Sequence, residues 1–72
     1  MKVYVLTRWG KKVARSTSNP DSPQYKVIAH LDRVRAATSD QIRSFTNLTS
    51  EQTGVALSRL RRNKPPLVEE VA

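Results

Sequence analysis

Two nearly identical four-residue segments begin eleven positions apart in this chain. They read Thr38-Ser39-Asp40-Gln41 and Thr49-Ser50-Glu51-Gln52. In each, the threonine hydroxyl can accept from an amide of the first helical turn while the glutamine reaches back to the threonine amide, and the acid favours the helix dipole. Each segment therefore predicts a helix start. The interval leaves room for about two helical turns, ending near Thr46, and a tight turn through Asn47 and Leu48.

The composition favours a small basic binding module. A chain of 72 residues makes one domain, and a domain of this size buries only about 60% of its unfolded surface, so we expect no enclosed active site and no enzyme. The formal net charge of +7 favours association with polyanions. Basic side chains come from both halves, with eight Lys and Arg in residues 1–37 and five in residues 38–72.

Several classes of site are excluded or disfavoured by the residues present. The absence of cysteine excludes disulfides and Cys-ligated zinc, and one histidine, His30, makes no metal site. Asp40 and Glu51 are explained by their caps, and Gly10 and Gly54 stand alone rather than in a phosphate-binding motif. No apolar run approaches the ~20 residues that span a bilayer, and the N-terminus lacks a signal-peptide core. We therefore expect a cytoplasmic protein with no cofactor, no membrane partner and no small-molecule ligand.

The N-terminal third predicts a strand, a short helix and a linker. Residues 2–6 are β-branched and aromatic, which is typical of a strand. Thr7 can cap a helix through about residue 15, in which Gly10 allows a close backbone approach. One face of this helix groups Leu6, Trp9 and Val13. Residues 16–22 carry turn chemistry and predict a linker.

The remainder predicts three helices and a strand. Pro23 opens the longest helix, over 23–37, and Pro65-Pro66 ends the last one before a strand at 67–71. We expect residues 2–6 to pair antiparallel with 67–71, because an isolated strand in so small a domain would leave its backbone groups unpaired. The expected core side chains are Val27, Ile28, Leu31, Val34, Ile42, Phe45, Leu48, Thr53, Ala56, Leu57 and Leu60. We expect a single domain, 1–72, made of an N-terminal part (1–22), a three-helix core (23–64) and a C-terminal strand (65–72).

Residues 24–71 resemble the winged-helix domain of small prokaryotic, especially archaeal, transcription regulators. The resemblance lies in a long helix, a capped short helix, a turn, a basic recognition helix and a strand that begins at Leu67. The recognition helix ends in Ala56-Leu57-Ser58-Arg59-Leu60-Arg61-Arg62. The segment from Leu6 to Arg15 is similar to the Leu-Thr-x-x-Gly segment that opens the final helix of such proteins, after the wing's second strand.

The order of these segments departs from the family pattern, because the Leu-Thr-x-x-Gly segment comes first. Either the N-terminal strand supplies the wing's missing partner, or the chain is cut from a longer array of such domains. Asn63-Lys64-Pro65-Pro66 replaces the usual glycine, and Gly54 inside the recognition helix indicates either a close approach or a tolerated defect. The expected fold is mainly α, of the α+β class. It is a winged helix-turn-helix of order β-α-α-α-α-β, whose terminal strands pair as a minimal wing.

Helical geometry selects the residues that could read DNA bases. With the stripe through Thr53 and Leu60 turned inward, the opposite face and its borders carry the candidates for base contact. These are Glu51, Gln52, Val55, Ser58, Arg59 and Arg62. An ordinary solvated helix face is the alternative for each of them.

The other basic residues are candidates for phosphate contact. They form a cluster around the first helix and a border along the helix-turn-helix unit: Arg8, Lys11, Lys12, Arg15, Arg43, Arg61 and Lys64. Trp9 and Tyr4 could stack on bases, although core packing is the favoured interpretation. His30 is expected on the outer surface of the long helix, beside Lys26 and Arg33.

These observations together predict sequence-specific binding to double-stranded DNA and transcriptional regulation by site occupancy. One alternative is a winged-helix module that binds a protein partner or RNA within a larger assembly. Another is an architectural protein that coats DNA with little discrimination. A homodimer is compatible with the sequence, which does not define the oligomeric state.

Overall fold

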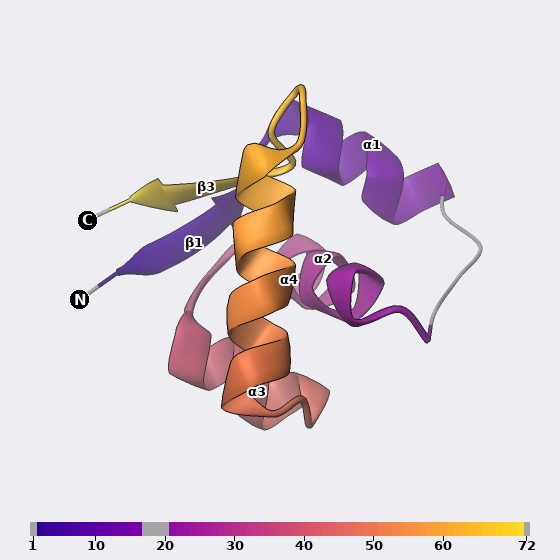
Figure 1. The fold of residues 1–72 in the computed structure, drawn as a ribbon. Helices are drawn as coiled ribbons and strands as arrows, with labels where there is room; N and C mark the ends of the chain where they lie inside the picture. Colours follow the sequence, from indigo (N-terminus) through magenta and orange to yellow (C-terminus); the bar gives the residue numbers. More distant parts are fainter. Residues whose placement is uncertain (1, 17–20, 72) are drawn as a thin grey trace.

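Four helices and a three-stranded sheet make up residues 2–16 and 21–71, which the computed structural model describes (Figure 1). In chain order they are β1 (Val3–Leu6), α1 (Arg8–Ser16), α2 (Pro23–Val34), β2 (Ala36–Thr38), α3 (Ser39–Thr46), α4 (Ser50–Arg62) and β3 (Val68–Val71). The fold is mostly helical and of the α+β class. Residues 17–20 of the predicted linker lie outside the described residues.

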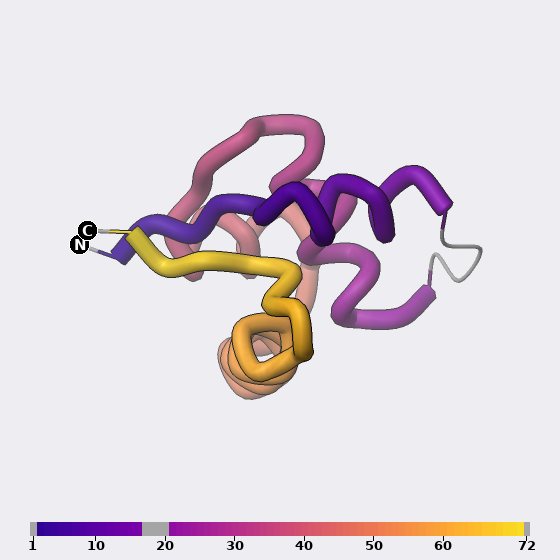
Figure 2. Tube along the Cα trace, turned by 90° about the horizontal axis from the view of Figure 1, so that it is seen from above, coloured from indigo at the N-terminus to yellow at the C-terminus, as the bar shows by residue number. Residues whose placement is uncertain are grey.

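The sheet is antiparallel, with strand order β2-β1-β3. Val3 pairs with Val71 on one side and with Thr38 on the other, so β1 is the central strand. The predicted antiparallel pairing of the terminal strands is therefore confirmed. In both views β1 and β3 lie side by side, with the start of β1 beside the end of β3 (Figures 1 and 2).

The long helix is shorter than predicted, and a strand follows it. The prediction of a helix over 23–37 is wrong at its end, since α2 stops at Val34. Arg35 takes a positive φ of 74°, which ends the helix, while its amide still donates to Leu31 O at 2.7 Å. The next three residues form β2, so the predicted order β-α-α-α-α-β lacks one strand. Pairing with β1 stabilises β2, whose two alanines carry no strand signal of their own.

The core forms where α2 packs against the other three helices and against the sheet. Predicted core residues are buried at Val27, Ile28, Leu31, Ile42, Leu48, Thr53, Ala56, Leu57 and Leu60. The sheet adds Tyr4, Leu6, Ala37 and Val68, so the favoured core position of Tyr4 is confirmed.

Four side-chain predictions are wrong. Trp9 is 39% exposed rather than buried, and the cationic groups of Arg8 and Lys12 lie 5.1 and 5.2 Å from its ring centre. Val34 and Phe45 are 44% and 58% exposed, whereas Ile42 and Leu48 are buried. His30, expected on the surface, is only 6% exposed and stacks on the Phe45 ring at a centroid distance of 4.3 Å.

Helix α1 packs on the core through Val13 and Ala14, and its first turn bonds to the segment before β3. The Thr7 hydroxyl accepts from Gly10 N at 3.2 Å, as the predicted cap requires, and donates to Pro66 O at 2.6 Å. A side chain at Gly10 would overlap the carbonyl oxygen of Leu67 and come within 2.9 Å of a Leu6 methyl group. The close approach predicted at Gly10 is therefore confirmed, and it holds α1 against the segment that leads into β3.

Candidate nucleic-acid interface

Helices α3 and α4 both begin in the predicted capping boxes. The Thr38 hydroxyl accepts from Gln41 N at 3.2 Å, and Thr38 N donates to Gln41 Oε1 at 2.9 Å. The same two bonds join Thr49 and Gln52, each at 3.0 Å. Between the helices, Asn47 takes the left-handed conformation with φ 64° and ends α3. Local hydrogen bonds thus fix where each helix begins, and the predicted helix starts at the two capping boxes are confirmed.

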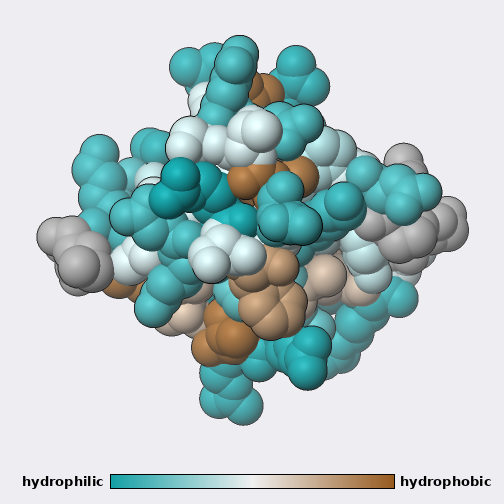
Figure 3. Space-filling view, turned by 90° about the horizontal axis from the view of Figure 1, so that it is seen from below, coloured by the Kyte–Doolittle hydropathy of each residue, from teal (hydrophilic) through white to brown (hydrophobic). Residues whose placement is uncertain are grey.

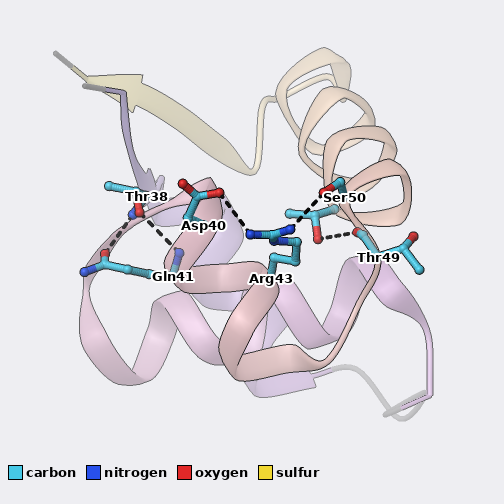
Figure 4. A network of polar contacts seen from close by, with 7 residues as sticks. Thr38, Asp40, Gln41, Arg43, Thr49 and Ser50 are labelled. Carbon is cyan, nitrogen blue, oxygen red and sulfur yellow. Dashed lines mark hydrogen bonds and ion pairs between the residues drawn. The ribbon is translucent and has the colours of Figure 1, made fainter.

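Arg43 links the two helices. Its guanidinium lies 3.4 Å from Asp40 Oδ1 within α3 and donates to Ser50 Oγ at 3.1 Å at the start of α4 (Figure 4). Arg43 was predicted to contact phosphate, and it is exposed. The guanidinium has five N–H donors, so these two contacts leave others available to an anion.

Helix α4 has a buried inner face and an exposed outer face, as predicted. The stripe from Thr53 to Leu60 is buried, whereas Val55 on the opposite side is 45% exposed. The other members of the predicted reading face are Glu51 and Arg62, which are exposed, and Ser58, which is half-buried. An exposed helix face that points away from the core is the geometry that entry into a major groove requires.

The two borders of this outer face differ. Helical spacing places Gln52 and Arg59 on one border, and Gly54 and Arg61 on the other. The carbonyl oxygen of the Gln52 side chain accepts from Thr49 N in its own helix cap, which leaves its two amide protons and one lone pair for another partner. At Gly54 an added Cβ would meet no atom within 4 Å, so close approach to α3 does not explain this glycine.

A shallow groove of about 220 Å³ lies along the second border, between α4, the start of α3 and β1. Its lining includes Tyr4, Ser39, Arg43, Ser50, Ser58 and Arg61. The predicted site did not include Ser39 and Ser50. Their place immediately after the two capping threonines was the available signal, since exposed amides at helix starts favour anions.

Glu70 introduces a negative charge beside this groove. Its Oε1 lies 3.4 Å from Arg61 Nη1 and 3.9 Å from Lys2 Nζ, and it accepts weakly from the Tyr4 hydroxyl at 3.4 Å. Arg61, a predicted phosphate contact, therefore has a carboxylate partner of its own. Sequence reasoning assigned Glu70 only to a strand, because its partners come from elements far away in the chain.

The remaining cations form two groups. Arg59, Arg62 and Lys64 are exposed, and within the described residues none of them forms an ion pair. Lys11 and Arg15 line a different hollow, between α1 and the end of α2, together with Asp32 and Arg35. In Figures 1 and 2, α1 continues from the end of β1 and extends away from the start of β1 and the end of β3. The structure thus separates the α1 cations from the groove beside α4.

No protein-family model, no curated protein and no solved structure matches the chain. Over residues 2–16 and 21–71, no three side chains of His, Cys, Asp or Glu are grouped so that they could hold a metal ion. None of the helices in that part of the chain has the length and apolar character needed to cross a membrane.

Proposed function

We propose that this protein binds double-stranded DNA in a sequence-dependent manner, through a winged helix-turn-helix whose recognition helix is α4. Its role would be transcriptional regulation by occupancy of a site. The observation that carries the proposal is the two-faced α4, which buries four side chains and exposes Val55, Ser58 and Arg62 from a helix pair fixed by two capping boxes.

The topology supports the winged-helix assignment. The sequence α2, β2, α3, α4, β3 matches the family order of helices, with a strand after the recognition helix. β1 lies beside β3 in the sheet, where the wing's second strand would be expected, and α1 follows β1 as the final helix follows that strand in the family. The N-terminal segment would then stand in for the end of an ordinary winged helix.

Electrostatics supports the choice of a nucleic acid as partner. The net charge of +7 favours a polyanion, and Arg59, Arg62 and Lys64 carry no ion pair within the described residues. Arginine on an exposed helix face can bind guanine through two hydrogen bonds, and Val55 can contact a thymine methyl group. Phosphate contacts would come from Arg43, Arg61 and Lys64, with Arg8, Lys11, Lys12 and Arg15 on the flanking backbone.

Selection of bound sequences from random duplex DNA tests this proposal. We expect one motif to be enriched, with an affinity for it that exceeds competitor DNA by at least ~10³-fold. Arg62→Ala should cost ~1–3 kcal/mol on that motif and change the preferred base at one position. Lys26→Ala, on α2, removes the same charge outside the proposed interface and should leave the preferred motif unchanged.

Each other outcome has a defined meaning. Tight binding without an enriched motif would indicate a protein that coats DNA rather than a sequence-specific regulator. An absence of duplex binding at physiological salt would remove the DNA assignment altogether. If Arg62→Ala and Lys26→Ala weakened binding equally at every sequence, α4 would be contributing charge without reading bases.

A further inference from the structure

An exposed aromatic ring lies on the side of α3 that the proposed DNA interface does not use. Phe45 is 58% exposed, and it belongs to the short helix α3, whose buried residue is Ile42. Val34, at the end of α2, is 44% exposed. Seen from below, the molecule shows brown and tan apolar surface surrounded by hydrophilic side chains (Figure 3). Exposed apolar groups that lie together mark contact surfaces more often than those scattered singly.

The surface around Phe45 is hollowed on both sides. One hollow of about 700 Å³ is lined by Phe45, Val34, Ala36, His30 and Asp40, among others, and the Asp40 carboxylate is paired with Arg43. A second, of about 350 Å³, lies between α2 and α3 and is lined by Phe45, His30, Ala29, Tyr25, Lys26 and Arg33. Phe45 therefore forms a ridge between two depressions, which are of a size that can receive side chains of another molecule.

His30 forms the floor that both hollows share. Its ring stacks on Phe45, with a centroid distance of 4.3 Å and an interplanar angle of 23°. Its Nδ1 is buried and has no hydrogen-bond partner among the described residues. Burial, together with the nearby Arg33 guanidinium, lowers the pKa of His30 below its usual value of 6.5, so the ring is neutral at pH 7. A neutral ring keeps the ridge apolar.

The charged border of the second hollow is entirely basic. Lys26 and Arg33 are its charged side chains, and the Arg33 guanidinium lies 5.8 Å from the centre of the Phe45 ring. Within the described residues neither of these two cations forms an ion pair. A second copy of this chain, itself carrying +7, would be repelled on approach, so charge complementarity favours an acidic occupant.

We propose that this ridge, formed by Phe45, His30, Val34 and the flanking Lys26 and Arg33, is a docking surface for a partner protein. The partner segment it fits is an amphipathic helix with an apolar stripe bordered by Asp or Glu. The stripe packs on Phe45 and into the hollows at its sides, while the acidic border pairs with Lys26 and Arg33. This surface is separate from the outer face of α4, so it does not depend on the proposed DNA binding.

Three synthetic peptides of about four helical turns test the proposal with the full ¹⁵N-labelled chain. The first has a leucine stripe bordered by glutamate, the second the same stripe bordered by lysine, and the third the composition of the first in scrambled order. We expect only the first to bind, with chemical-shift changes confined to α2, β2 and α3. Phe45→Ser should weaken binding at least tenfold, whereas Val71→Thr, which alters an exposed apolar side chain on β3, should not.

Charge reversal tests the proposal through a gain of binding, which an unfolded variant would not show. Arg33→Glu should abolish binding of the glutamate peptide and create binding of the lysine peptide. Equal binding of all three peptides, no binding of the first, or shift changes centred on α1 or α4 would overturn the proposal. Self-association of the chain that Phe45→Ser removes would assign the ridge to a second copy instead. Phe45→Ser should keep its affinity for duplex DNA, which separates this test from that of the proposed function.

Discussion

Helices α1 and α4 are both basic, yet they are built in different ways. α4 begins in a complete capping box and buries four side chains, from Thr53 to Leu60. Of the described residues of α1, only Gly10 is buried, while Val13 and Ala14 are partly buried against the core and the first turn bonds to the segment before β3 through Thr7. The cations of α4 therefore extend from a helix that is packed deeply through four side chains, whereas those of α1 extend from a helix that is packed less deeply.

This difference bears on what each set of cations can do. Reading a base requires that hydrogen-bonding groups be held in register with the base edge, whereas a phosphate contact tolerates variation in position. The well-packed α4 suits the first task. α1 suits the second, and the cationic groups of its Arg8 and Lys12 also lie over the exposed Trp9 ring.

The largest expected effect concerns packing. Leu60→Ala removes a buried side chain from the inner face of α4 and should lower the free energy of unfolding by ~2–5 kcal/mol. Val13→Ala trims a partly buried residue of α1 and should cost about 1 kcal/mol. Urea unfolding of both variants, with an unchanged dependence on denaturant, provides the measurement. Equal costs would contradict the difference between the two helices.

Each of the two helices contains one glycine, Gly10 in α1 and Gly54 in α4, and their substitution by alanine tests how closely each helix packs. Gly10→Ala would force a Cβ into the Leu67 carbonyl and should destabilise the fold by ~1–3 kcal/mol. Gly54→Ala meets open space and should stabilise it by about 1 kcal/mol, since alanine is the better helix former. The melting temperatures should shift in opposite directions. A stabilising Gly10→Ala would show that α1 can move away from Leu67 at little cost.

The sequence predicted well those features that depend on local chemistry. Both capping boxes, the cap at Thr7 and the buried stripe of α4 follow from side chains that lie a few residues apart, and all are confirmed. The pairing of β1 with β3 was also predictable, because two short strands in a small domain each need a partner. Outward-facing positions on α4 followed from the same periodicity.

The features that were missed depend on distant parts of the chain. β2 exists because β1 offers it an edge, and nothing in Ala36–Thr38 indicates a strand. His30 is buried because the Phe45 ring of α3 stacks on it, whereas Phe45 itself stays 58% exposed. Glu70 acquires its cationic partners from Lys2, which precedes β1, and from Arg61 of α4. Periodicity assigns a residue to a face of its own helix, but the neighbouring element decides whether that face is covered.

The smallest expected effect tests the two roles directly on DNA. Alanine at both Lys11 and Lys12 should weaken binding to all sequences alike, and the magnitude of the salt slope should fall by up to ~1.8, because each phosphate contact contributes ~0.9. Arg59→Ala, on the border of the α4 reading face, should alter which sequence is preferred. Titrations of the selected motif and of an unrelated duplex at several salt concentrations distinguish these effects. A changed preference in the Lys11 and Lys12 variant would mean that α1 also reads bases, and helix packing would then not decide which cations specify sequence.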